Sequence, residues 1–189
     1  IIAQTRLRLA GVMPESKARR VSLFDGDARP IRKGSLAKPT QFGYTGQVTD
    51  NPDGIVLDYE LEAGIPPDGP RLGPAIESII AAVGTTPGAV TADRGYGLAS
   101  VDTQLEDLGV DLVAIPRKGQ PGAARRDAQS EDRFVELVKW RTGSEGRIAT
   151  LKRQHGWERA RNRGLEGARI WCGWGVLSHN LVKIAGLTH

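Results

Sequence analysis

The chain has 189 residues, enough for one domain with a sizeable core, and it carries a formal net charge of +4 with a sequence pI near 9.5. Its single cysteine, Cys172, excludes an internal disulfide and a zinc cluster, and it lies in an apolar stretch typical of a buried, reduced thiol. No charge-free apolar run reaches about eighteen residues, so we expect no membrane span, and the reduced cysteine favours a cytoplasmic location.

Hydrophobic periodicity predicts an α/β fold in which a β-hairpin is followed by alternating helices and strands. Such an order implies a mixed sheet with helices on its faces. We expect residues 1–39 to be the end of a helix and a basic loop, and residues 40–189 to form the main domain. Because the chain opens in what looks like the middle of a helix, we expect a fragment. The elements expected are a helix end at 1–13, strands at 42–49 and 55–61, a helix at 72–83, a strand at 89–92, a helix at 98–108, a strand at 111–115, a loop at 117–132, a helix at about 134–155 with a break near Gly143, a turn framed by Gly164 and Gly167, and a helix at 168–187.

Charge is distributed unevenly along the chain. Residues 1–39 carry nine Lys/Arg and three Asp/Glu, residues 40–116 carry two and twelve, and residues 117–163 carry thirteen and six. Two basic segments therefore flank an acidic middle. This pattern suits a protein that binds a polyanion and holds divalent cations nearby, although an inert, uneven surface would have the same pattern.

Asp93 directly follows the short apolar strand expected at 89–92 and precedes Arg94-Gly-Tyr-Gly97. Ligands of such folds gather at the carboxyl ends of parallel strands, and glycines let a ligand approach the backbone closely. The alternative is an aspartate that only caps the following turn.

A second candidate lies on the basic helix that contains Val138 to Arg153. Arg141, Glu145, Ile148 and Lys152 follow at steps of four, three and four, so they share one helical face. Glu145 is the only carboxylate between Glu136 and Glu158. A lone carboxylate among cations is either neutralised by them or held for a metal ion.

Asp93 and Glu145 together suggest phosphodiester chemistry. Such reactions commonly use two Mg²⁺ ions roughly 4 Å apart, held by carboxylates from distant parts of a chain. Cations on the same helix would then hold phosphates, and the candidates are Arg141, Arg147, Lys152 and Arg153.

Other polar and aromatic residues favour structural roles. His155, His179 and His189 are too scattered for a zinc motif, and we expect His179 and Asn180 to be a satisfied core or capping pair. We also expect Trp171 and Trp174 to lie in the core, and Asp58 and Glu60 to face solvent.

Several motifs, in order, resemble one protein family. They are Val90-Thr-Ala-Asp-Arg-Gly-Tyr96, Val113-Ala-Ile-Pro-Arg117, Trp140-Arg141 with Glu145-Gly-Arg-Ile148 and Leu151-Lys-Arg153, Gly164-Leu-Glu-Gly-Ala-Arg169, and Trp174-Gly-Val-Leu-Ser-His-Asn-Leu181. Nearly the whole chain resembles the C-terminal part of bacterial insertion-sequence transposases of the DDE type. The likeness is strongest to groups related to the IS4 and IS5 clans, including ungrouped ISNCY and IS1182-like members.

The resemblance implies an RNase H-like fold and a metal site made of three acids. Asp93 matches the second acid and Glu145 the third. Relatives carry a Tyr, Arg, Glu, Lys signature, and here Arg141, Glu145 and Lys152 match its last three positions, whereas Val138 occupies the tyrosine position. The first acid ends a strand that precedes the hairpin. It lies either upstream, with that strand missing from this chain, or at Asp25.

The implied function is cleavage and strand transfer of an insertion sequence, with two Mg²⁺ or Mn²⁺ ions in the complete enzyme. The implied partners are double-stranded DNA, at transposon ends and target, and further copies of the chain. The implied location is the bacterial cytoplasm, at the nucleoid. With one acid missing, this chain alone would be inactive. Two alternatives remain, a non-catalytic DNA-binding remnant and an RNase H-like metal-dependent nuclease.

Overall fold

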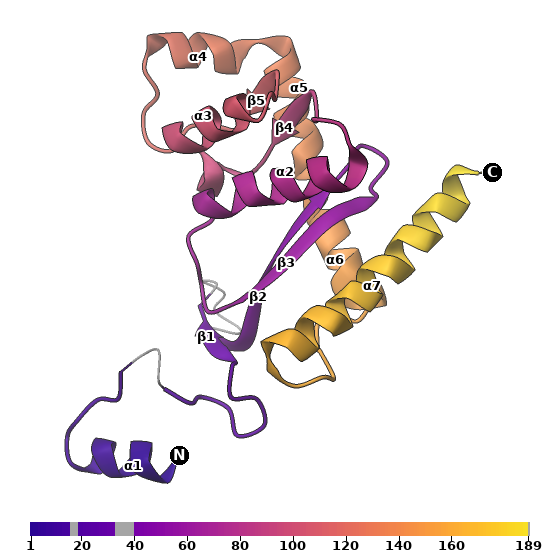
Figure 1. Ribbon diagram of the computed structural model, residues 1–189. Coiled ribbons are helices and arrows are strands. Elements are labelled where there is room, and N and C mark those ends of the chain that lie inside the picture. Colours follow the sequence, from indigo (N-terminus) through magenta and orange to yellow (C-terminus); the bar gives the residue numbers. More distant parts are fainter. Residues whose placement is uncertain (16–18, 33–39, 189) are drawn as a thin grey trace.

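The computed structural model describes residues 1–15, 19–32 and 40–188, and it is a mixed α/β arrangement of helices around two small sheets (Figure 1). The four expected strands are present, each within two residues of its expected bounds. Residues 33–39 of the expected basic loop lie outside the described residues. The elements are α1 (Ile2–Leu9), β1 (Arg29–Ile31), β2 (Gln41–Asp50), β3 (Val56–Ala63), α2 (Gly69–Val83), β4 (Ala89–Thr91), the 3₁₀ helix η1 (Arg94–Tyr96), α3 (Ala99–Asp107), β5 (Leu112–Ala114), α4 (Ala123–Ser130), α5 (Asp132–Thr142), α6 (Ser144–Gln154) and α7 (Gly164–Leu187).

The strands form two separate sheets. β1, β2 and β3 are antiparallel in that order, whereas β4 and β5 form a parallel pair. The β2–β3 hairpin turns at Gly54, whose φ of 78° suits glycine, and the Asn51 side chain accepts a hydrogen bond from the Ile55 N–H at 2.8 Å. In Figure 1 the long β2–β3 ribbon lies apart from the short β4–β5 pair, with α2 crossing in front and α5 and α6 behind.

The largest apolar core lies where α2 and α3 pack on β4 and β5. Leu72, Ile76 and Ile79 of α2 follow at steps of four and three and are all buried, which is the stripe of an amphipathic helix. Leu105 of α3 and Ile115 after β5 are 0% exposed and belong to the same cluster. Burial of this stripe therefore fixes α2 and α3 against the parallel pair.

The hairpin is covered on its other side by α6 and α7. Two small apolar clusters join these elements, one around Leu151 and one around Leu61. His179 is buried, and its Nε2 lies 2.9 Å from the Gly54 carbonyl oxygen. The Asn180 side chain accepts from the Val56 N–H at 2.9 Å and donates to the Val56 carbonyl at 2.8 Å. The expectation that His179 and Asn180 are structural is confirmed, and Cys172 is buried as expected.

Two expectations about secondary structure were wrong. The segment 117–132 contains α4, which has no buried residue and therefore no apolar period for the sequence to reveal. Arg125 holds α4 in place by donating to the Ile115 carbonyl at 2.9 Å. α7 begins at Gly164, so the turn framed by Gly164 and Gly167 is instead the first turn of that helix. The expected break near Gly143 is confirmed, because α5 ends at Thr142 and α6 begins at Ser144.

Two expectations about burial were also wrong. Trp174 is 66% exposed, because it lies on the side of α7 that faces away from the hairpin. Asp58 and Glu60 are only partly exposed, because α2 covers their face of β3. Burial raises the pKa of Asp58, which a hydrogen bond from Ser78 partly offsets. Among the helices of the described ranges, none is long and apolar enough to cross a membrane.

Candidate active site

A cavity of about 830 Å³ lies between the hairpin and the parallel pair. Residues 46–51 of β2 and its turn line one side, and residues 88–92 along β4 line the other. Apolar side chains form much of its remaining walls, from α2 on one face and from α5 and α6 on the other, and Arg133, Glu136 and Arg141 of α5 also line it. The apolar wall residues are Leu72, Ile76, Ile79, Leu137, Trp140 and Ile148. The cavity is thus bounded by two strand edges and two helical layers.

Asp93 lines this cavity at the carboxyl end of β4. Its side chain is exposed, and Oδ1 accepts a hydrogen bond from the Gly95 N–H at 2.6 Å, which caps η1. Arg94 anchors the same loop by donating to the carbonyl oxygens of Arg117 at 3.2 Å and Gly119 at 2.9 Å. The Asp93 carboxylate therefore caps η1 and is also exposed to the cavity. Capping thus leaves it available as a ligand.

The loop after Asp93 leaves little room around its glycines. A β-carbon at Gly97 would collide with the carbonyl oxygen of Pro116, and one at Gly95 would lie 2.8 Å from Asp93 Oδ1 and 2.5 Å from Asp68 Oδ2. The backbone is thus packed tightly against both carboxylates. It follows that the carboxylates of Asp68 and Asp93 are close neighbours across Gly95.

Asp68 was missed in the sequence. It immediately precedes α2, yet its side chain makes no capping hydrogen bond, and it lines the cavity. The only local signal was an acid in the Pro66-Pro-Asp68 turn, and such acids are common in turns. Its closeness to Asp93 depends on how α2 packs against η1, which no local pattern encodes.

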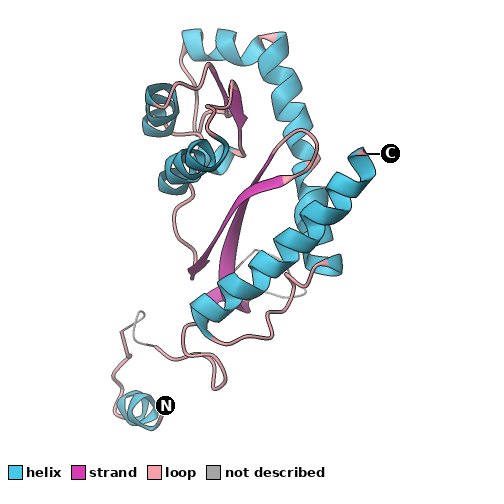
Figure 2. Cartoon of the chain, turned by 45° about the vertical axis from the view of Figure 1, so that its right-hand side comes forward, coloured by secondary structure: helices cyan, strands magenta, loops and turns pink. Residues whose placement is uncertain are grey.

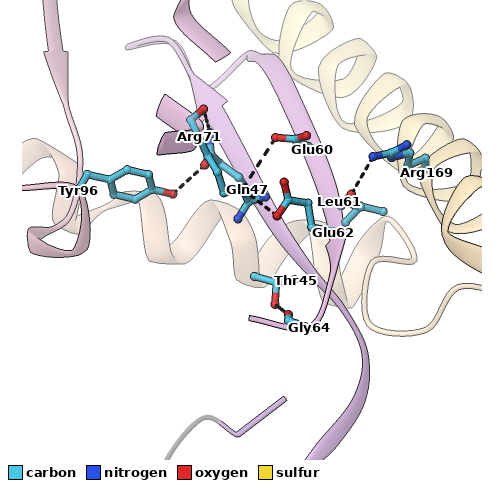
Figure 3. Close-up of polar contacts among 9 residues, drawn as sticks. All are labelled: Thr45, Gln47, Glu60, Leu61, Glu62, Gly64, Arg71, Tyr96 and Arg169. Carbon is cyan, nitrogen blue, oxygen red and sulfur yellow. Dashed lines mark hydrogen bonds and ion pairs between the residues drawn. The ribbon is translucent and has the colours of Figure 1, made fainter. Parts of the chain in front are cut away.

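Tyr96 of η1 connects this loop to the hairpin. Its hydroxyl donates to Gln47 Oε1 at 2.9 Å, and burial, with the charges of Asp68 and Asp93 adding to it, raises the pKa of Tyr96 to about 12. Figure 3 shows Tyr96 reaching across to Gln47 on β2. The hydrogen bond holds the Asp93 loop at a fixed distance from the β2 edge.

Arg71 of α2 lies beside the same glutamine and is buried at 6% exposure. Its Nε is 3.8 Å from Glu60 and 3.7 Å from Glu62, and Gln47 Nε2 donates to the Arg71 carbonyl at 3.3 Å (Figure 3). A buried guanidinium between two carboxylates binds α2 to the hairpin. We therefore assign Arg71 a structural role.

The helix that carries Glu145 forms the opposite wall. Arg141 of α5 and Ile148 of α6 both line the cavity, and they precede and follow Glu145 by four and three residues. Glu145 itself lies in the first turn of α6, and its side chain lies outside the described part of the structure. The backbone thus places Glu145 between two residues of the cavity wall.

The four basic candidates on this helix have different surroundings. Arg141 lines the cavity. Arg147 forms an ion pair with Asp50, and its guanidinium lies 4.7 Å from the centre of the Trp140 ring. Lys152 and Arg153 are exposed and line a separate hollow of about 260 Å³, together with Ile148, Ala149 and Glu158. Only the last two therefore present a basic surface away from the cavity.

Asp25, the alternative first acid, is engaged elsewhere. It accepts hydrogen bonds from the Tyr44 hydroxyl at 2.8 Å and from the Gly164 N–H at 3.2 Å, where α7 begins. Burial opposes ionisation, but these bonds and one from the Asp27 N–H hold the pKa of Asp25 below its ordinary value. Asp25 is not among the residues that line the cavity.

Among the residues whose side chains the structure describes, which do not include Glu145, no group of three His, Cys, Asp or Glu side chains is arranged to hold a metal ion. Asp68 and Asp93 supply hard oxygen donors of the kind that Mg²⁺ prefers, and they fit part of such a site.

Comparison with known proteins gives one match. No curated protein and no solved structure matches the chain. The model of one family, described as a transposase DDE domain, matches residues 17–181, which is most of the chain. The chain is therefore a member of the transposase DDE domain family.

Proposed function

We propose that this chain is the C-terminal part of the catalytic domain of an insertion-sequence transposase, in which Asp93 and Glu145 hold divalent metal ions for DNA cleavage and strand transfer. One observation carries the proposal. Asp93 lines the same cavity as Arg141 and Ile148, the residues that flank Glu145 on the opposite wall. A carboxylate on one wall of a cavity and a second on the helix that forms the opposite wall would be the basis of a shared metal site.

Mg²⁺ or Mn²⁺, when bound, would activate the attacking oxygen and stabilise the leaving oxygen of the phosphodiester. The chain's own residues hold the ligands in place. The Gly95 N–H orients the Asp93 carboxylate, and the Tyr96–Gln47 hydrogen bond fixes the loop relative to β2. Asp68 adds negative charge beside Asp93 and thereby supports cation binding.

We further propose an RNase H-like sheet in which one more strand occupies the cavity between β2 and β4. β2 pairs with β1 only at residues 41–43, and β4 pairs with β5 on one edge. Within the described ranges, no strand pairs with the rest of that β2 edge or with the second edge of β4. Residues 44–50 of β2 therefore offer room for a strand of about six residues, a common strand length.

The cavity walls suit such a strand, because apolar side chains cover it from α2 on one face and from α5 and α6 on the other. A strand buried on both faces is a largely apolar run. If it lay parallel to β4, its last residue would end beside Asp93, where the first acid is needed. This favours a position outside these 189 residues for that acid over Asp25, which caps the start of α7.

DNA contacts are assigned to the basic helix. We propose that Lys152 and Arg153 contact phosphates from the exposed side of α6, and that Arg141 contacts phosphate at the cavity mouth. Arg147 acts mainly by holding α6 to Asp50 of β2. The relationship to the IS4 and IS5 clans, and the division into residues 1–39 and 40–189, belong to the same proposal.

The test is a nicking and joining assay on plasmid DNA that carries transposon ends, with Mg²⁺ or Mn²⁺. The 189-residue chain should be inactive, whereas a chain extended through the upstream coding sequence should nick the ends. Glu145→Gln and Asp93→Asn in the extended chain should abolish nicking. Glu106→Gln, an exposed acid of α3, is the matched control and should leave nicking unchanged.

Other outcomes would replace the proposal. Nicking without joining would favour the nuclease, and DNA binding without either reaction would favour the non-catalytic remnant. Activity of the 189-residue chain that Asp25→Asn removes would place the first acid at Asp25. The added strand has its own readout, because it should slow hydrogen exchange at amides of β2 and β4 that face the cavity.

A further inference from the structure

α7 carries large apolar side chains on the side that faces away from the protein. Figure 2 shows this helix lying along the front of the molecule with no other element over its outer side. Five of these side chains follow at steps of four, three, four and three, and we call them the outer seam. They are Ile170, Trp174, Leu177, Leu181 and Ile184, with exposed fractions of 50, 66, 47, 59 and 49%.

The inner side of the same helix has the opposite character. Ala168, Cys172, Gly175 and His179 are buried, and at 100° per residue they lie opposite the outer seam. A side chain on Gly173 would collide with the Tyr59 hydroxyl, and one on Gly175 with the backbone at His155, so α7 packs closely on the body through small residues. The five exposed residues of the outer seam are therefore not required for packing within the chain.

The spacing of the outer seam identifies the shape of its partner. Apolar residues that alternate at steps of three and four form the contact stripe of helices that pair side by side in a coiled coil. A stripe of 15 residues spans about four helical turns. Hydrophobic side chains in such a continuous exposed row indicate a protein contact.

We propose that the outer seam is a homodimer interface, in which α7 of one copy packs antiparallel against α7 of a second copy across a two-fold axis. The seam is nearly symmetric about Leu177. Antiparallel pairing places Leu177 against Leu177, Trp174 against Leu181, and Ile170 against Ile184. The same surface thus serves both copies, as a two-fold interface requires.

Charge does not oppose this pairing. The charged residues of α7 are Glu166, Arg169 and Lys183, and none belongs to the outer seam. Arg169 donates to the Leu61 carbonyl at 3.2 Å, and Lys183 lies against the hairpin turn at Gly54, so both basic side chains are directed toward the body. An apolar, uncharged stripe can meet its own copy without repulsion.

The exposed area of the outer seam is also adequate for a dimer interface. The exposed parts of the five side chains amount to roughly 600 Å² per copy, close to the ~800 Å² per partner of a standard protein interface. Neighbouring side chains would add to the contact. The proposed dimer does not depend on the proposed metal site. It identifies the surface of α7 through which two copies of the chain would associate.

Sedimentation equilibrium of the full 189-residue chain tests the interface. The wild type should be a dimer at roughly 50 µM, and Leu177→Asp and Leu181→Asp should each weaken association by more than about tenfold, since a buried unpaired charge is costly. The matched control is Val182→Asp, which is 65% exposed on the same helix but outside the seam, and should remain dimeric. Circular dichroism should show all variants folded, because the replaced residues are exposed.

Cross-linking tests the orientation, in a Cys172→Ala background that removes the native thiol. Leu177→Cys should form an intermolecular disulfide on oxidation, because the two copies of this residue face each other. Ile184→Cys alone should not, whereas it would in a parallel pair. A wild type that is monomeric at roughly 50 µM, or a Val182→Asp variant that dissociates as readily as Leu177→Asp, would overturn the proposal.

Discussion

Two halves of the molecule are held together in different ways. Around β4 and β5, one continuous cluster of buried apolar residues joins both strands to α2 and α3. Around β2 and β3, two small clusters are supplemented by polar bonds from α7 to the hairpin backbone. The cavity with Asp93 lies where these two halves meet. The candidate site is therefore positioned by a rigid apolar half on one side and a polar-anchored half on the other.

The largest effect on stability should come from the apolar half. Leu105 is fully buried in the large cluster, so Leu105→Ala should lower the free energy of unfolding by about 2–5 kcal/mol. Urea denaturation followed by circular dichroism would measure it. The exposed Val83→Ala in α2 is the control, and a similar loss in both variants would contradict the importance of this core.

The polar half should respond to loss of hydrogen bonds. Asn180→Ala removes two bonds to the Val56 backbone and leaves that N–H and carbonyl unpaired, so we expect a loss of about 1–3 kcal/mol. Replacing Val182, which is 65% exposed on the same helix, by alanine is a nearby comparison. If Asn180→Ala were as mild as Val182→Ala, the hairpin would not depend on polar anchoring.

The connection between the halves should be visible at high pH. The pKa of Tyr96 is raised to about 12, above its ordinary value of 10.0, so the neutral hydroxyl stabilises the fold below pH 10. This contribution should be lost as the pH rises from 10 to 12. Thermal unfolding across that range should show a smaller decline for Tyr96→Phe than for the wild type. An unchanged decline would mean that Tyr96 does not bridge the halves.

Much of the fold follows from local pattern, and much of the site does not. Alternation predicts β2 and β3, a short apolar run predicts β4 with Asp93 after it, and Gly143 predicts the break between α5 and α6. Those features depend on neighbours in sequence. By contrast, α4 has no buried side, and it is held by an arginine contact that no periodicity reveals.

Trp174 and Asp68 illustrate what a local sequence pattern does not predict. An apolar helix can turn either side inward, and here the side with Ala168, Cys172 and Val176 packs on the hairpin, whereas Trp174 faces outward. Asp68 and Asp93 become neighbours only because α2 packs beside η1. The orientation of α7 and the closeness of the two aspartates both depend on which surfaces pack together. The residue pattern of a single segment does not contain that information.

The smallest effect should concern DNA binding by the basic side of α6. Lys152→Gln and Arg153→Gln should each reduce the slope of log affinity against log salt by about one unit, because each removes a phosphate contact. Fluorescence anisotropy with duplex DNA at several salt concentrations would show it. Gln154, the last residue of α6 and the neighbour of Arg153, gives a neutral control through Gln154→Ala. A DNA affinity that does not change with salt concentration would contradict an electrostatic contact.

The central claim is that Asp93 and Glu145 face one metal site across the cavity. Mn²⁺ titration followed by electron paramagnetic resonance tests it most directly in the 189-residue chain. Binding should be weak, and Asp93→Asn and Glu145→Gln should each weaken it by about tenfold or more, whereas Glu106→Gln should not. If one ion uses both carboxylates, the double variant should lose much less than the sum of the single losses. Binding that both variants leave unchanged, or losses that add fully, would contradict a shared site.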